Sequence, residues 1–222
     1  WPLPSMPLAP LSARAVNTVL LTYEGRDKTF RFLQFASRAL LGLTAGARSR
    51  YAKVLNTLAL RIMVSIAGSR RSFRWGREIP IMLEIPRSLA LADPVERVMD
   101  VLQKVTILMF FWTDHLGWLH QVRGGMKSGS GTIQRGLKWL TVSSIIAAIS
   151  AVRRLRVLRA AEGAPGGQGA GADTERRATL VRAWRNGLLA VQTAHLSRIW
   201  ESHDAIVGTL GMVTSTIDVL QV

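Results

Sequence analysis

The sequence predicts an all-α, membrane-associated helical protein with amphipathic N-terminal helices and one or two C-terminal hydrophobic membrane segments. Apolar residues recur at helical spacing through most of the chain, and strand-like alternation is scarce. The 222 residues are 48% hydrophobic with a mean hydropathy of +0.19, yet 29 Lys and Arg against 14 Asp and Glu give a net charge of +15. This composition is too apolar for a disordered basic tail and slightly too apolar for an ordinary soluble domain.

The N-terminal part of the chain divides into a lead and a helical region. Residues 1–23 are a lead of uncertain status, and its start, WPLPSMPLAPLSARAV, has no basic segment followed by an apolar run and so does not resemble a secretory signal peptide. Residues 24–122 form a basic amphipathic helical region. Within it we expect a helix over 26–41, a second helix from Tyr51 to about Gly68, and a third that begins at Asp93-Pro94 and runs toward Val122.

The C-terminal half alternates between flexible and apolar segments. Gly124, Gly125, Gly129 and Gly131 mark residues 123–138 as a hinge. Residues 139–152 are a first hydrophobic membrane segment, although 14 residues cover only about 21 Å of a hydrocarbon core of about 30 Å. Residues 153–204 form a basic loop with a Gly-rich linker and a helix. Residues 205–222 form the C-terminal membrane segment, which carries the single charge of Asp218.

The sequence contains no recognisable enzyme signature. The chain has no cysteine, which excludes thiol catalysis and cysteine-based zinc sites, and its histidine pairs lack metal-ligand spacing. Asp114-His115 is half of a catalytic dyad without a nucleophile elbow, so we interpret it as a polar pair on a helix surface. The glycines before Lys127-Ser128 do not match a phosphate loop. We therefore expect no catalytic residue, no metal and no cofactor.

The positive charge leaves nucleic acid as a minor alternative. Cations and aromatic rings interleave in one part of the chain, which would suit base stacking on an RNA-binding module. These residues are Arg48, Arg50, Lys53, Arg70, Arg71, Arg74 and Arg77, with Tyr51, Phe73 and Trp75. Because the cations lie beside long apolar stripes, anionic lipid is an equally good partner, and we expect no nucleic acid. Core packing remains open as the explanation of each apolar stripe.

Four short motifs occur in order along the chain, within GRDKTFRFLQFASR, SRRSFRWGR, DHLGW and GTLGMVTSTID. They comprise Gly25, Arg26 and Asp27; Ser69, Arg70, Phe73, Arg74 and Gly76; Asp114, His115 and Trp118; and Gly208, Gly211 and Ser215. Together, over residues 24–220, they resemble the peroxin-11 family of peroxisomal membrane proteins.

The resemblance implies a protein that elongates peroxisomes, or a related organelle such as the glycosome, before division. It would be an integral or tightly associated protein of that membrane. In the family, an N-terminal amphipathic helix inserts into the leaflet, the chain forms homo-oligomers, and dynamin-type fission machinery acts on the resulting tubule. On this chain we expect anionic phospholipid to contact Lys28, Arg31 and Arg38, and acyl chains to contact Phe30, Leu33 and Leu40.

A basic cluster follows the first apolar segment and looks like a targeting signal read by the membrane-protein import receptor of peroxisomes. It consists of Arg153, Arg154, Arg156 and Arg159. A headgroup anchor or solvated face remains the alternative interpretation.

A pore for small metabolites is the alternative function within membranes. Hydroxyl residues of the apolar segments, namely Ser143, Ser144, Ser150, Thr209, Thr214 and Ser215, could line a channel in an oligomer. Such residues more often form hydrogen bonds between or within helices.

Overall fold

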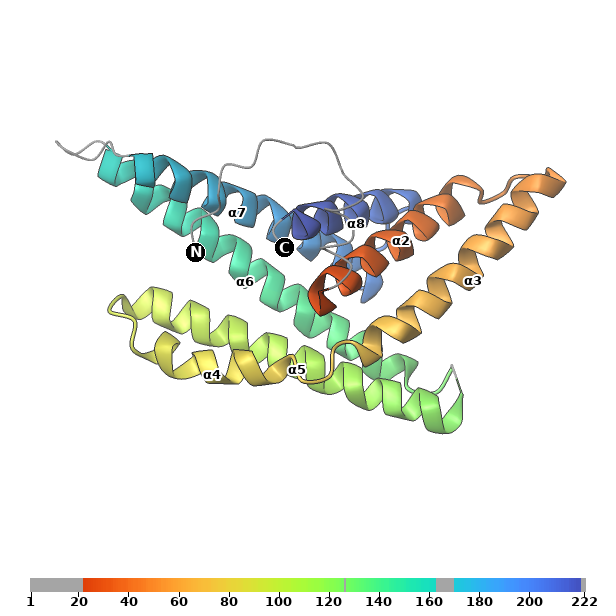
Figure 1. Cartoon of the computed structure of the whole chain (residues 1–222), viewed down its shortest axis with the longest axis horizontal. Coiled ribbons are helices and arrows are strands. Elements are labelled where there is room, and N and C mark those ends of the chain that lie inside the picture. Colours follow the sequence, from red (N-terminus) through yellow and green to blue (C-terminus); the bar gives the residue numbers. More distant parts are fainter. Residues whose placement is uncertain (1–21, 126, 163–169, 221–222) are drawn as a thin grey trace.

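The computed structural model describes residues 22–125, 127–162 and 170–220, and this part of the chain is all-α without strands (Figure 1). Its helices are α2 (Tyr23–Leu43), α3 (Arg50–Ser72), α4 (Glu78–Leu89), α5 (Pro94–Gly124), α6 (Ser130–Glu162), α7 (Ala170–Leu196) and α8 (Asp204–Val219). The all-α prediction is confirmed.

Short polar side chains start several of these helices. The Thr22 hydroxyl accepts a hydrogen bond from the Gly25 amide at the start of α2. The Asp93 carboxylate accepts one from the Val95 amide at the start of α5, directly before Pro94, as the sequence predicts. The helices α2, α3 and α5 therefore coincide with the three predicted N-terminal helices to within a few residues.

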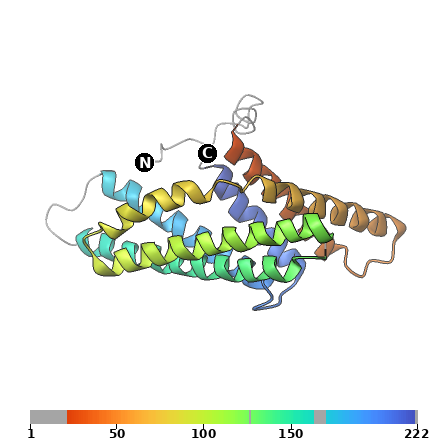
Figure 2. The same ribbon diagram turned by 90° about the horizontal axis from the view of Figure 1, so that it is seen from below.

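Helix α4 is an element that the sequence analysis did not delimit. Gly76 precedes it with φ of +84°, a left-handed conformation that makes the sharp turn out of α3. Pro80 lies in the first turn of α4, where backbone N–H groups have no helical acceptor, so the ring is tolerated there. In Figure 2, α4 lies along α5.

The long helices pack as successive neighbours, and the chain then closes on itself. Helix α5 packs on α6, and α6 packs on α7. Helix α8 packs on both α7 and α2, which brings the first and last described helices side by side (Figure 1). Helix α3 contacts α2 over much of its length and α5 only slightly, so much of its surface stays uncovered.

Glycines allow α2 and α8 to approach closely. A Cβ atom added at Gly208 would collide with the backbone of Ala39, and one added at Gly211 would collide with the Phe35 ring. On the other helix, a Cβ at Gly42 would collide with the backbone of Ala205. The glycines of the fourth motif therefore serve a helix-to-helix contact.

Two predicted boundaries change. The hinge assigned to residues 123–138 is shorter, because α5 ends at Gly124 and α6 already begins at Ser130. The linker is bracketed by Glu162, where α6 ends, and Ala170, where α7 begins; residues 163–169 lie outside the described part. The lead over residues 1–23 is also outside it, apart from its last two residues.

The structure corrects the prediction of membrane-spanning segments. Residues 139–152 form the middle of α6, and residues 205–219 belong to α8. Within the described ranges, no helix combines the length and apolar character that crossing a membrane requires. In α6 the apolar run is bounded by Lys138 and Arg153, and α8 has 16 residues, or about 24 Å.

Candidate membrane-facing surface and polar interior

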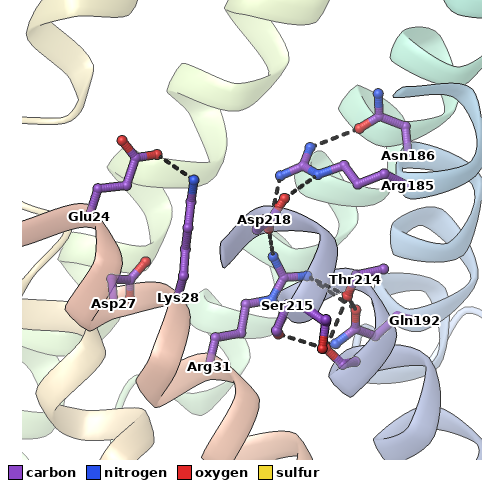
Figure 3. A network of polar contacts seen from close by, with 12 residues as sticks. Glu24, Asp27, Lys28, Arg31, Arg185, Asn186, Gln192, Thr214, Ser215 and Asp218 are labelled. Atoms are coloured by element: carbon purple, nitrogen blue, oxygen red, sulfur yellow. Dashed lines mark hydrogen bonds and ion pairs between the residues drawn. The ribbon is translucent and has the colours of Figure 1, made fainter. Parts of the chain in front are cut away.

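Asp218 of α8 joins three helices through buried ion pairs (Figure 3). Arg31 of α2 donates from Nη1 to Asp218 Oδ2 at 2.8 Å, and Arg185 of α7 donates from Nε to Oδ1 at 2.8 Å. The Arg31 Nη2 atom also donates to Thr214 Oγ1 at 3.2 Å and to Gln192 Oε1 at 3.3 Å. Burial lowers the pKa of Arg31 to about 10, against the opposing effect of Asp218, so Arg31 stays charged at neutral pH.

A second buried ion pair joins α2 to α3. Arg70 donates from Nε to Asp27 Oδ1 at 2.9 Å and from Nη1 to Gln34 Oε1 at 2.7 Å. Burial lowers the pKa of Arg70 to about 9. Burial alone would raise the pKa of Asp27, but Arg70, Arg74 and Arg77 outweigh that effect and hold it below its ordinary value. The first and second motifs are thus complementary halves of one contact.

A third cluster joins α3 and α4 to α5, and it overturns one interpretation of the sequence. Arg74 donates from Nη1 to Asp114 Oδ2 at 2.8 Å, with Arg71 Nε 3.6 Å from Oδ1. His115 Nδ1 lies 2.7 Å from Glu78 Oε1. The prediction that Asp114-His115 is a polar pair on a helix surface is wrong, because Asp114 is only 1% exposed and His115 is also buried.

Aromatic rings reinforce the same junction. Trp75 stacks on His115 with ring centroids 4.3 Å apart, and Trp118 meets Trp75 edge-on at 5.9 Å. Phe73 stacks on Phe30 of α2 at 5.9 Å. The second motif therefore connects α2, α3 and α5 through both charges and rings.

The remaining motif residues have local roles. The Ser69 hydroxyl donates to the Ser65 carbonyl and the Ser215 hydroxyl donates to the Gly211 carbonyl, both within their own helices. Arg26 is exposed at the start of α2. The sequence analysis missed Arg185 and Glu78 as partners of the motifs, because each comes from a part of the chain outside them.

The cations predicted to bind lipid contact carboxylates of the chain itself. Lys28 lies 3.0 Å from Glu24, and Arg38 Nε lies 3.3 Å from Asp204 Oδ1 of α8. Arg31 is the buried partner of Asp218. In this conformation, the polar side of α2 therefore faces protein.

The apolar residues predicted on α2 are distributed differently. Leu33 is exposed, whereas Phe30 and Leu40 are half-buried. Of the three, only Leu33 is exposed enough to contact lipid without movement of α2.

The basic cluster proposed for targeting lies in the C-terminal part of α6 and comprises Arg153, Arg154, Arg156 and Arg159. Arg153 Nη2 lies 2.6 Å from Asp93 Oδ2, and Arg154 Nη2 lies 2.6 Å from Glu175 Oε1. Arg156 and Arg159 are exposed. The cluster therefore contains two arginines with carboxylate contacts, of which Arg154 is itself partly exposed, and two further exposed arginines.

The cations of the nucleic-acid alternative divide into two groups. Arg70, Arg71 and Arg74 bind Asp27 or Asp114 and are directed at the protein interior. Arg48, Arg50 and Lys53 are exposed at the start of α3 and in the turn before it.

Helix α5 presents an apolar stripe to the outside. Its members alternate at spacings of three and four residues and are all exposed: Val95, Val98, Leu102, Val105, Met109, Trp112, Leu116 and Leu119. Trp112, the largest of them, is 65% exposed. A continuous stripe of this length is far more apolar surface than scattered exposed residues would give.

Helix α3 exposes a second stripe, along the helix predicted from Tyr51 to about Gly68. Its apolar residues at helical spacing are Tyr51, Val54, Leu55, Leu58, Ile62 and Ile66; the first five are exposed, with Tyr51 at 85%, and Ile66 is half-buried. Core packing therefore does not explain this stripe in the described conformation.

Polar groups occupy the interior of the same structure. The carboxylates of Asp27, Asp114 and Asp218 are buried against arginine partners, and the interior also holds apolar side chains such as Phe110 and Phe111. The long apolar stripes of α3 and α5 nevertheless lie outside, whereas a soluble helical domain turns such stripes inward. Exposed apolar stripes around paired interior charges suit contact with lipid.

The hydroxyls considered for a pore mostly form hydrogen bonds with backbone carbonyls. Ser144, Thr209, Thr214 and Ser215 donate within their own helices, and Ser143 donates to the Gln103 carbonyl across α5 and α6. Ser150 lines a polar cavity of about 930 Å³ between α5, α6 and α7. For the other five, these contacts favour hydrogen bonding within a helix, or between helices in the case of Ser143, over channel lining.

Comparison with known families agrees with the motifs. The model of the family described as peroxisomal biogenesis factor 11 (PEX11) matches residues 14–222. No curated protein and no solved structure matches the chain significantly. Because the family match extends over nearly the whole chain, this protein belongs to the peroxisomal biogenesis factor 11 family, whose members are non-enzymatic biogenesis factors of the peroxisomal membrane.

Proposed function

We propose that the chain binds and remodels the peroxisomal membrane and so promotes elongation and division of peroxisomes. Family membership implies a role in peroxisome proliferation. The observation that carries the mechanism is the combination of ion pairs inside the structure with long exposed apolar stripes on α3 and α5. Apolar faces that enter one leaflet expand it relative to the other, which bends the membrane.

Anionic phospholipid is the proposed partner of the basic residues around these faces. The net charge of +15 attracts the chain to a negative surface, and each cation near such a surface contributes about 1 kcal/mol. Arg31 and Arg38 contribute to this contact once α2 separates from α8, because lipid phosphate then replaces Asp218 and Asp204. Lys28 contributes by exchanging Glu24 of its own helix for lipid phosphate. While α2 stays packed on α8, Leu33 supplies an apolar contact of α2 together with the exposed Phe32 and Leu43.

Self-association and recruitment complete the proposal. Homo-oligomers would concentrate the inserted apolar faces along a tubule, and dynamin-type fission machinery would then act on that tubule. Arg156 and Arg159 offer an exposed basic surface to the membrane-protein import receptor of peroxisomes.

Giant vesicles containing phosphatidylserine test the proposal. The purified full-length chain should bind them and draw tubules, and high salt should weaken binding because it screens the basic residues. A Leu58→Asp, Leu55→Asp variant, altered on the exposed stripe of α3, should bind without tubulating. Intact tubulation by that variant, or smooth vesicles with the unaltered chain, would contradict the proposed mechanism.

A further inference from the structure

Helix α4 has its most apolar face turned away from the protein. Ile79, Met82 and Leu83 are exposed by 62%, 58% and 71%. Ser88 is buried at the opposite side of the helix, since residues 79 and 88 lie about 180° apart at 100° per residue. Viewed down the helix axis, Met82, Pro86, Ile79 and Leu83 are neighbours in that order, and no charged residue lies between them.

Polar contacts hold the other side of α4 to the protein. Glu78 lies 2.7 Å from His115 Nδ1 at the start of the helix. Glu84 lies 3.7 Å from Lys104 Nζ further along. These two contacts show that α4 runs along α5 in the opposite direction, from His115 toward Lys104.

The apolar face of α4 continues that of α5. On α5, the residues that contact α4, Lys104 and His115, lie roughly 100° around the helix from the centre of the exposed stripe. The outward face of α4 therefore flanks the stripe that contains Met109 and Trp112. Arg87, which is exposed, borders the face of α4 and can meet lipid phosphate while its neighbours enter acyl chains.

We propose that α4 is a second lipid-inserting element of this protein, a short helix that lies in one leaflet with Ile79, Met82 and Leu83 among the acyl chains. The inference rests on the proposed membrane-remodelling function and names a site for it apart from α2 and α3. Lipid is chosen over a second copy of the chain because the family resides in the membrane and because the face is continuous with the α5 stripe and bordered by Arg87. With 12 residues, α4 would displace lipid over about 18 Å without crossing the bilayer.

The absence of cysteine in the sequence makes the test direct. Single cysteines are introduced in the full-length chain as Met82→Cys and, as a control on an exposed charged position of α7, Arg177→Cys, and each is labelled with an environment-sensitive fluorophore. The labelled chains are added to vesicles of phosphatidylcholine and phosphatidylserine, with or without nitroxide on the acyl chains. The label at position 82 should shift to the blue and be quenched by acyl nitroxide several-fold more than the label at position 177.

Other outcomes overturn the inference in distinguishable ways. Equal quenching at positions 82 and 177, with vesicles still tubulated, would leave the proposed function standing and remove α4 from the membrane. A blue shift that is not accompanied by quenching from the acyl nitroxide, and that is lost when unlabelled chain is added in excess, would assign the face to a contact with a second copy of the chain. Failure of the unlabelled chain to bind the vesicles would overturn both proposals. As a second arm, Met82→Asp with Leu83→Asp should keep the helical circular dichroism spectrum and lose tubulation.

Discussion

Arg31 of α2 and Asp218 of α8 form a buried ion pair at 2.8 Å, although 187 positions of sequence separate them. The pair holds the first described helix to the last one. It also occupies a cation that the amphipathic pattern of α2 assigns to lipid. The Arg31 guanidinium can therefore bind either Asp218 or a lipid phosphate, so membrane contact through Arg31 competes with the packing of α2 on α8.

Asp218→Asn should destabilise the protein strongly. The substitution removes the negative charge that neutralises Arg31 and Arg185 in a buried site, and loss of one partner of such a pair costs about 3–5 kcal/mol. Thermal unfolding followed by circular dichroism in detergent micelles measures the effect. Arg154→Met is the matched control, because its pair with Glu175 is about half exposed and should change stability little.

Gly208→Val should separate α2 from α8. The added side chain would meet the backbone of Ala39, which cannot move aside as a flexible side chain can, and overpacking costs about 1–3 kcal/mol. Gly187→Ala on α7 is the control, since a Cβ atom there meets nothing and alanine favours helix. A lower unfolding midpoint is expected for the first variant alone, and equal midpoints would show that the close approach is not required.

The α2–α3 junction should weaken in acid. The pKa of Asp27 in the folded protein lies below its ordinary value of 3.8. Its ion pair with Arg70 therefore contributes stability above that ordinary value, and the contribution is lost as the pH falls through the lowered pKa. The unfolding midpoint should be nearly constant from pH 7 to about pH 5 and then fall steeply.

Asp27→Asn is the variant that assigns this acid step. It should flatten the pH dependence only in part, because the pKa values of Asp93 and Asp100 are lowered as well. An unchanged slope in the variant would mean that Asp27 does not contribute to the acid step.

The exposed arginines of α6 should carry the targeting signal. Arg156→Ser with Arg159→Ser removes two positive charges without breaking the contacts of Arg153 and Arg154 with Asp93 and Glu175. Fluorescence microscopy of the tagged chain should show it leaving peroxisomes for the cytosol or other membranes. The double variant Arg177→Ser with Arg182→Ser removes the same charge from α7 and should stay peroxisomal; identical behaviour of the two would refute a localised signal.

Local signals predicted much of the fold. Asp93 and Pro94 mark the start of α5 because a cap and a fixed φ act within one turn. Helix α4 is not predicted, because prolines usually end helices and α4 contains Pro80 and Pro86. The sequence does not show that Pro80 lies in the first turn, nor how the helix packs around Pro86.

The partners of the charged residues could not be predicted in the same way. Helical periodicity puts Arg31 on a face but does not say what packs there, and lipid phosphate and a distant carboxylate are both anionic partners. Asp27, Asp114 and Asp218 offered the missing signal. A carboxylate buried among helices needs a cation beside it, and the second motif supplies such cations for Asp27 and Asp114. For Asp218 the cations are Arg31 and Arg185, which lie outside that motif.

On the proposed function, the apolar stripes on the outside of the bundle face lipid while the paired charges face inward. Spin labels placed one at a time along α5 of the full-length, otherwise cysteine-free chain, bound to phosphatidylserine vesicles, test it most directly. Collision with oxygen, which is concentrated in acyl chains, should peak at Leu102, Val105, Met109 and Trp112 and be low at Gln103, Thr106 and Phe110. Peaks for a water-soluble relaxation reagent at the first set of positions would contradict the account.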